Sequence, residues 1–380
     1  MNTKPSLWLM VLLLMFPQIV ETIYSPALGS IADSFAVTYS QASQTISIYF
    51  SAFALGVVVW GILADKLGRR PTMLLGLVIY SLAALSALLT DSFTYLMIAR
   101  AVSAFGIAVG SVITQTMLRD AFDTKELSKV FSLMGMGISI SPVLGMLLGG
   151  QLTQFGGYHY VFIALFIMAL VLVAYNLVAL PETQKTKQPL ELKQLGLKML
   201  KDINIWRSGC LVALFNIALF SYYQLGAFKF EQLGLSSQEF GYSGIVLGLG
   251  TFIGSYLNKY LISKQVSLLR LLQLSALLLT LGGILVTYLI DSIWFLLPMI
   301  LVVMSFGIAI PNILSVALID YKQQAGSAGA LFGLMYYLMI GAGLSLAGSI
   351  QHLGIVLLMC GVISSLLVAF KKIITCSLLH

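Results

Sequence analysis

Twelve apolar segments constrain this chain more than any other feature of its sequence. A helix needs about 20 mostly apolar residues to cross the hydrocarbon core of a bilayer. The segments fall near residues 7–29, 42–63, 72–90, 94–116, 128–150 and 158–180, and then near 206–228, 241–260, 268–289, 293–317, 327–349 and 353–370. We therefore expect an all-α integral membrane protein with twelve transmembrane helices.

The composition excludes several other classes of protein. Of the 380 residues, 59% are hydrophobic and 9% are charged, whereas a soluble domain has about 45–50% apolar and about 25% charged residues. An ordinary soluble enzyme, a nucleic-acid reader and a disordered protein are therefore excluded. The three histidines, His159, His352 and His380, have no metal-ligand spacing, and no acids or nucleophile cluster near a membrane face. We expect no catalysis, no cofactor and no nucleic-acid partner.

The net charge of +7 is distributed unevenly between the loops. Cytoplasmic loops of membrane proteins carry an excess of lysine and arginine. In this chain one side of the expected helices carries nearly all of them: Lys4, Lys66, Arg69, Arg70, Arg119, Lys125, Lys129, the cations from Lys185 to Arg207, Lys259, Lys264, Arg270, Lys322, Lys371 and Lys372. The pattern predicts a multi-pass membrane protein with both termini in the cytoplasm.

One long hydrophilic stretch, residues 181–205, divides the helices six and six. We expect an N-terminal bundle over 1–180, a cytoplasmic linker over 181–205 and a C-terminal bundle over 206–380. Residues 190–201 have amphipathic spacing, which fits a helix on the inner membrane surface and equally a solvated linker. A faint repeat at an offset of 193 residues relates Gly61 to Gly254 and Asp65 to Asn258. Two pseudo-symmetric six-helix bundles are the arrangement of rocking transporters.

The loop after the second segment carries the most specific motif, GILADKLGRR, which begins at Gly61. Gly68 permits a tight turn, and Asp65 can pair with a base or cap a neighbouring helix. A simple positive-inside loop explains Arg69 and Arg70 but not the aspartate between glycines. The motif resembles the loop signature of the major facilitator superfamily. That resemblance implies that Gly61, Asp65, Gly68, Arg69 and Arg70 form a switch between inward- and outward-facing states.

A second motif lies in the fifth segment, where Gly137, Pro142 and Gly145 are spaced as G-x3-S-P-x2-G. Proline removes a backbone donor and small residues let helices approach closely, although both are common in membrane helices. The spacing resembles the fifth-helix signature of proton-coupled exporters, with Ser141 at a usual glycine. The resemblance implies antiport.

The segment ETIYSPAL from Glu21 resembles the first-helix pattern of the drug:proton antiporters with twelve helices, with Glu21 where that pattern has aspartate. The segments LRDAF from Leu118 and AGSAGALFG from Ala325 resemble the bicyclomycin and chloramphenicol resistance (Bcr/CflA) branch. The fourth-helix pattern survives only at Arg100, Ser103, Ala104 and Gly106.

Two charged residues fall well inside the expected membrane segments, Glu21 and Arg100. Intramembrane charges are costly and usually functional. Their distances from the outer helix ends are similar, so both could face one cavity in which Glu21 loads and releases a proton. The alternative is a static salt bridge between the first and fourth helices.

The substrate residues are expected on the first, seventh and eleventh helices. Apolar pockets with few polar groups suit lipophilic ligands. The alternative is that these aromatic residues only pack the helices together, as most aromatic residues in membrane helices do. The residues with these properties are Tyr24, Asn216, Phe220 and Tyr223, with Tyr222 and Gln224 beside them, and Tyr336 and Tyr337.

These features together predict a secondary active transporter that works by alternating access. The leading function is proton-coupled export of small amphipathic compounds by a monomer, with the proton gradient as the energy source. A proton-coupled carrier of a specific metabolite or siderophore is the alternative. A channel or a membrane enzyme fits less well, because neither explains two halves and a switch loop.

Overall fold

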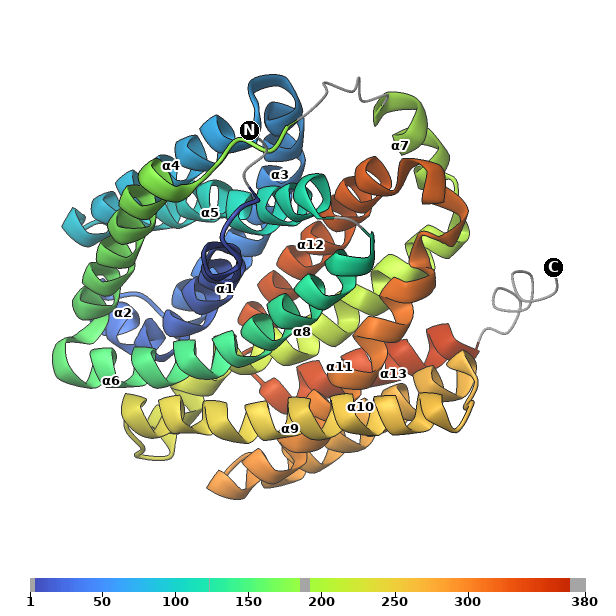
Figure 1. The fold of residues 1–380 in the computed structure, drawn as a ribbon. Coiled ribbons are helices and arrows are strands. Elements are labelled where there is room, and N and C mark those ends of the chain that lie inside the picture. Colours follow the sequence, from blue (N-terminus) through green and yellow to red (C-terminus); the bar gives the residue numbers. More distant parts are fainter. Residues whose placement is uncertain (1–3, 123, 185–191, 370–380) are drawn as a thin grey trace.

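A computed structural model describes residues 4–122, 124–184 and 192–369, and nearly all of them are helical. Figure 1 shows two groups of helices, one blue to green and one yellow to red. The first group comprises α1 (Leu7–Ile23), the short η1 (Ser25–Ala27), α2 (Leu28–Ser34), α3 (Tyr39–Leu67), α4 (Arg69–Leu89), α5 (Phe93–Ala121) and α6 (Thr124–Ala179). After α7 (Leu192–Leu200), the second comprises α8 (Ile203–Gln232), α9 (Ser237–Ser263), α10 (Leu268–Leu289), η2 (Ile293–Phe295), α11 (Leu296–Ala317), η3 (Ile319–Gln324), α12 (Ala325–Ile350) and α13 (Leu353–Ala369).

The predicted all-α membrane fold with twelve spans is confirmed. Within the described residues, ten helices are long and apolar enough to cross a bilayer. One of these, Leu133–Ala179, contains two spans, because the backbone leaves the helical conformation at Gly156 and Gly157. The twelfth span is α13, a shorter apolar helix. The backbone stays helical through Pro142, so the break lies between the two spans rather than at the proline.

Side-chain caps fix where α3 and α9 start. Thr38 accepts a hydrogen bond from the backbone of Gln41, and the Gln41 side chain bonds back to Thr38, which forms a capping box before α3. Ser236 and Glu239 form the same box before α9. Each box satisfies donors that a helix start leaves free. Equivalent helices of the two halves therefore begin with the same device.

We call the ends near Arg69 and Arg119 inner and the ends near Asp33 and Glu239 outer. The two halves contact each other through α3 with α12 and through α6 with α9. A Cβ atom on Gly150 would lie only 2.8 Å from the Cα atom of Gly241, which shows how closely α6 and α9 approach. Gly241 lies near the outer start of α9, and Gly150 lies six residues before the break at Gly156 that ends the first span of α6. The structure is therefore closed on the outer side.

The amphipathic segment after the first half forms α7, and α7 packs on the second half beside α12. Leu195 and Met199 are buried, whereas Leu197 and Leu200 are exposed. The helix therefore has one apolar side against protein and another that remains free. Residues 185–191 of the predicted linker, and Lys371 and Lys372, lie outside the described residues.

Candidate functional site

Arg100 lies inside the first half, with its guanidinium between two tyrosine rings. The guanidinium carbon is 3.8 Å from the ring centre of Tyr24 and 4.8 Å from that of Tyr49. Only 2% of the residue is exposed, and its Nε atom has no hydrogen-bond partner in the described part of the chain. Aromatic faces stabilise a cation but leave its donors unused. Arg100 is thus held in place with hydrogen-bonding capacity to spare.

Glu21 lies close to Arg100 without forming an ion pair with it. Glu21 is 7% exposed, and Arg100 acts on its carboxyl group electrostatically. None of the ion pairs among the described residues joins the two. The static salt bridge considered from the sequence is therefore not formed in this outer-closed structure, which leaves the Glu21 carboxyl group free of a fixed cation.

Aromatic side chains from both halves surround these two charges. Phe50 stacks edge-on against Phe220, with ring centres 4.5 Å apart, and Phe53 meets Tyr337 at 5.0 Å. Glu21 is near enough to Tyr49, Tyr223 and Tyr336 to act on their hydroxyl groups electrostatically. We call this set the aromatic cluster: Tyr24, Tyr49, Phe50, Phe53, Phe220, Tyr223, Tyr336 and Tyr337.

Four of the five predicted substrate residues fall in the aromatic cluster, and Asn216 does not. The Asn216 amide donates to the carbonyl oxygen of Val212 in its own helix at 2.8 Å. Tyr222, also named from the sequence, packs inside the second half, where its hydroxyl donates to Ser243 at 2.5 Å. Sequence spacing places these residues on one helix but cannot tell which side of α8 faces the other half.

Gln224 holds the outer closure rather than a substrate pocket. Its Nε2 atom lies 2.9 Å from the carbonyl oxygen of Ser43, 3.1 Å from Ser47 Oγ and 3.0 Å from the carbonyl oxygen of Leu344. The side chain is fully buried. It therefore joins α8 of one half to α3 of the other and to α12. Only the tertiary structure assigns it this position.

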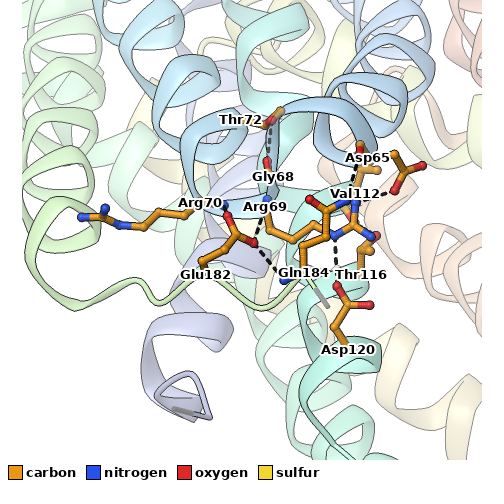
Figure 2. A network of polar contacts seen from close by, with 10 residues as sticks. All are labelled: Asp65, Gly68, Arg69, Arg70, Thr72, Val112, Thr116, Asp120, Glu182 and Gln184. Carbon is orange, nitrogen blue, oxygen red and sulfur yellow. Dashed lines mark hydrogen bonds and ion pairs between the residues drawn. The ribbon is translucent and has the colours of Figure 1, made fainter. Parts of the chain in front are cut away.

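The inner end of the first half holds a network of charges around Arg69 (Figure 2). Arg69 Nη1 lies 2.5 Å from Asp65 Oδ1, and Arg69 Nε lies 3.0 Å from Asp120 Oδ2. The Arg69 side chain is 9% exposed, so the two carboxylates compensate a cation largely removed from water. Removing one partner of a buried ion pair strongly destabilises the folded protein, because the other charge stays buried without compensation. The motif thus ties α3, α4 and α5 together.

Glu182, which follows α6 in the sequence, caps the start of α4. Its carboxylate accepts hydrogen bonds from the backbone nitrogens of Arg69 and Arg70, both at 3.0 Å. A carboxylate at a helix start satisfies free donors and interacts favourably with the helix dipole. Of the two roles that the sequence allowed for Asp65, an ion pair or a cap, the structure shows the ion pair, with Arg69. Nothing in the loop motif itself points to Glu182.

The glycines of the loop motif differ in what they permit. Gly68 has φ of 109°, and a Cβ atom there would lie 2.7 Å from a Glu182 oxygen. A side chain at this position would therefore be strained and would also displace the cap. A Cβ atom on Gly61 would meet only Val112, at 3.9 Å, which is an ordinary contact. Arg70 points outward and donates to the carbonyl oxygen of Leu177 at 2.7 Å.

The glycines of the fifth-helix motif face α1. A Cβ atom on Gly137 would lie 3.1 Å from the Val11 side chain, and one on Gly145 would lie 3.1 Å from the Ile19 carbonyl oxygen. Pro142 sits between them within α6. The motif lets α6 approach the helix that carries Glu21. Across the described ranges, no three His, Cys, Asp or Glu side chains gather as metal ligands.

Comparison with known proteins decides the family. The family model described as Major Facilitator Superfamily matches residues 8–344. The chain belongs to this superfamily. Its fold resembles a solved bacterial homologue of the human lysosomal transporter Spinster, in an inward-facing and unoccupied conformation, with a TM-score of 0.77 and 15% identity over 95% of each chain.

Some relatives of similar length have names associated with drug resistance, whereas an "Uncharacterized transporter" of Rickettsia felis, 30% identical over 89% of this chain and 88% of its own length, has no such name. Multidrug resistance protein D of Escherichia coli is 28% identical over 92% of this chain and 89% of its own length. A bicyclomycin resistance protein homologue of Haemophilus influenzae is 26% identical over 88% and 87%. The predicted membership of the superfamily, with resemblance to its drug-efflux members, is confirmed.

Proposed function

We propose that this superfamily transporter exports small amphipathic compounds in exchange for protons by alternating access. The observation that carries the proposal is the placement of Glu21. It is a buried carboxyl group without an ion-pair partner in the described residues, beside Arg100 and among tyrosines of both halves. A carboxyl group at the meeting point of two moving halves can exchange its proton with a different compartment in each state.

The aromatic cluster supports amphipathic substrates. Its side chains offer apolar faces with single hydroxyl groups, and sites of this composition suit lipophilic ligands with few polar atoms. The names of the drug-resistance relatives agree with this class. We propose that the protein works as a monomer in a bacterial inner membrane, with both termini cytoplasmic, and that it catalyses no covalent reaction and needs no cofactor.

The test is proton release on substrate binding by the purified protein. Counterflow in liposomes with a compound panel, beginning with bicyclomycin, first identifies a substrate. Binding of that compound should then release protons from the wild type but not from Glu21→Gln, whose amide has the shape of the protonated carboxyl group. Undiminished release from Glu21→Gln would exclude this residue as the coupling site.

A structural role for the two charges gives a different result. If Glu21 and Arg100 only stabilised the fold, Glu21→Gln and Arg100→Ala would each lower stability by about 3–5 kcal/mol, as breaking a buried pair does. The double variant would then partly recover. The coupling role predicts instead that Glu21→Gln keeps its thermal stability and its substrate binding while proton release is lost.

A further inference from the structure

A pocket of about 580 Å³ opens at the outer ends of the two halves, where they meet. The first half lines it with residues of η1, α2 and the end of the first span of α6, and the second half with residues of α8, α9 and the turn between them. Its two charged residues are Asp33 of α2 and Glu231 of α8, and both are exposed. No lysine or arginine is among the described residues that line the pocket. The pocket is therefore negatively charged and open to water.

The two carboxylates are neighbours although they belong to different halves. A Cβ atom on Gly29 would lie 2.8 Å from a Glu231 carboxylate oxygen, so Glu231 rests against the face of α2 that carries Gly29. Asp33 follows four residues later on the same helix, and side chains with this spacing lie about 5–6 Å apart on one helix face. Asp33 and Glu231 also both act electrostatically on the hydroxyl group of Tyr39. The outer closure thus holds two negative charges side by side.

No cation among the described residues compensates this pair. Neither carboxylate takes part in an ion pair there, and Lys229, two residues before Glu231, binds Asp291 at 2.9 Å instead. Tyr39 faces Glu231 with a neutral hydroxyl group, which leaves both charges in place. The helices that carry the two acids also end here, α2 at Ser34 and α8 at Gln232, and helix C-termini add negative potential. Like charges repel, so a cation from the surrounding water would offset a cost of closing the outer side.

A buried hydroxyl group at the same pocket also lacks a partner. Thr153 lines the pocket and is 8% exposed, and its Oγ1 atom has no hydrogen-bond partner in the described part of the chain. A buried polar group without a partner costs free energy, which an N–H donor on an occupant would recover. Pro26, Ala227 and Leu235 add apolar surface to the lining. The pocket therefore combines two negative charges, a free hydrogen-bond acceptor and an apolar wall.

We propose that this pocket binds a linear aliphatic diamine, with one ammonium group for each carboxylate. The N–H groups supply donors for Thr153 Oγ1, and the methylene chain covers the apolar wall. A metal ion matches the pocket less well, because Mg²⁺ and Ca²⁺ need six or more oxygen ligands around one point. Across the described ranges, no third acidic, histidine or cysteine side chain joins these two carboxylates. The volume is in the range of pockets for small organic ligands.

The diamine joins the two halves, because Asp33 belongs to one and Glu231 to the other. The two carboxylates separate when the outer ends move apart, and the diamine then loses one of its ion pairs. A ligand that binds one of two states more tightly raises the population of that state. The diamine therefore favours the outer-closed state.

The experiment measures binding to the full-length protein in detergent by isothermal titration calorimetry, at fixed pH and ionic strength. The ligands are the diamine putrescine, the monoamine butylamine, which has the same carbon chain, and Mg²⁺. We expect putrescine to bind about fivefold or more tightly than butylamine and Mg²⁺, because only putrescine forms an ion pair with each carboxylate. Spin labels at the outer ends should report a larger outer-closed population when putrescine is present.

Three variants alter the pocket itself. Glu231→Gln and Asp33→Asn each remove one charge and keep the shape of the side chain, so each should lose the preference for putrescine over butylamine. Without ligand, each should also be more outer-closed than the wild type, because the repulsion between the carboxylates is gone. Thr153→Val removes the hydroxyl group and keeps both charges, and it should bind putrescine more weakly.

Two further variants are controls for the position of the site. Asp91→Asn removes an exposed acid on the outer side that does not line the pocket, and it should keep the preference for putrescine. Glu21→Gln changes the central carboxyl group and should keep the preference as well. A loss of the preference in Glu21→Gln would place the diamine in the central site and overturn the proposal.

Equal affinities of the wild type for putrescine and butylamine would also overturn the proposal, whatever the variants do. The same holds if Mg²⁺ binds as tightly as putrescine, if Glu231→Gln keeps the preference, or if Thr153→Val binds putrescine as the wild type does. None of these readouts involves transport or proton release, so they are independent of the function proposed above.

Discussion

The inner ends of the two halves use different chemistry at equivalent places. In the first half, Asp65 of α3 and Asp120 of α5 share Arg69. In the second half, Asn312 of α11 donates to Asn258 of α9 at 2.7 Å, and both amides are buried. The helix pairs correspond, because α3 packs on α5 as α9 packs on α11. Ions in one half are thus replaced by neutral amides in the other.

The same contrast holds through the membrane. Among the described residues, the buried charged side chains of the first half are Glu21, Arg69 and Arg100, and the second half has only Arg207. Gln224, the second half's contribution to the outer closure, is again an amide. A neutral hydrogen bond contributes about 0.5–1.5 kcal/mol, whereas breaking a buried ion pair costs about 3–5 kcal/mol. The repeated scaffold therefore concentrates energetically decisive groups in the first half.

The largest effect is expected at Glu21, which tests whether coupling belongs to the first half. Glu21→Gln should reduce transport driven by a pH gradient to the background of empty liposomes, because the amide cannot release a proton. Uptake into proteoliposomes measures this. Asp291→Asn is the control in the second half. Lys229 holds the pKa of the exposed Asp291 carboxyl below its usual range, so Asp291 stays ionised and should be dispensable. Equal losses of transport in Glu21→Gln and Asp291→Asn would show that coupling is not specific to the first half.

Asp65→Asn should come next and should nearly abolish transport while expression is unchanged. The variant replaces an ion pair by the amide chemistry of the second half. A loss of ~2 kcal/mol of stabilisation specific to one state changes the ratio of states about thirtyfold. Transport assays and spin-label distances between the inner ends measure the two effects. Wild-type rates in Asp65→Asn would refute a switching role for this motif.

Gln224→Leu should have an intermediate effect, because it removes the amide that joins the halves on the outer side. Losing a neutral hydrogen bond costs about 0.5–1.5 kcal/mol, which corresponds to a change of about 2- to 12-fold in the ratio of states. Spin labels at the outer ends should therefore report more outer-open protein. Asn216→Leu removes an amide eight residues earlier on α8. It is the matched control and should leave the distances between the outer spin labels unchanged. No change in Gln224→Leu would show that packing alone closes the outer side.

The smallest effect is expected from Asn258→Ala. One neutral hydrogen bond is lost, and the Asn312 amide still donates to the carbonyl oxygen of Ile308 at 2.7 Å. Thermal unfolding in detergent should show a loss of about 1 kcal/mol, with transport retained. Transport loss as severe as that of Asp65→Asn would mean that the two halves contribute equally to switching.

The sequence by itself determined the fold class, because a bilayer leaves a chain of this composition few solutions. Backbone groups in lipid must be paired within each segment, so twelve apolar segments of sufficient length become twelve helices. The predicted boundaries agree closely with the structure: the segment expected at 268–289 forms Leu268–Leu289, and that at 42–63 extends to Tyr39–Leu67. The caps at Thr38 and Ser236 lie just outside the apolar runs and account for such extensions.

The sequence also identified the charges worth examining, since Glu21, Asp65, Arg69 and Arg100 stand out in an apolar chain. Apart from the pair between Asp65 and Arg69, which are four residues apart, their partners were decided only by the tertiary structure. Glu182 lies 113 residues after Arg69 yet caps the helix that begins there, and Gln224 meets Ser43 across 181 residues. The period of a helix shows which residues share a face. It does not show which neighbour that face meets, because this depends on how twelve similar apolar helices pack against one another.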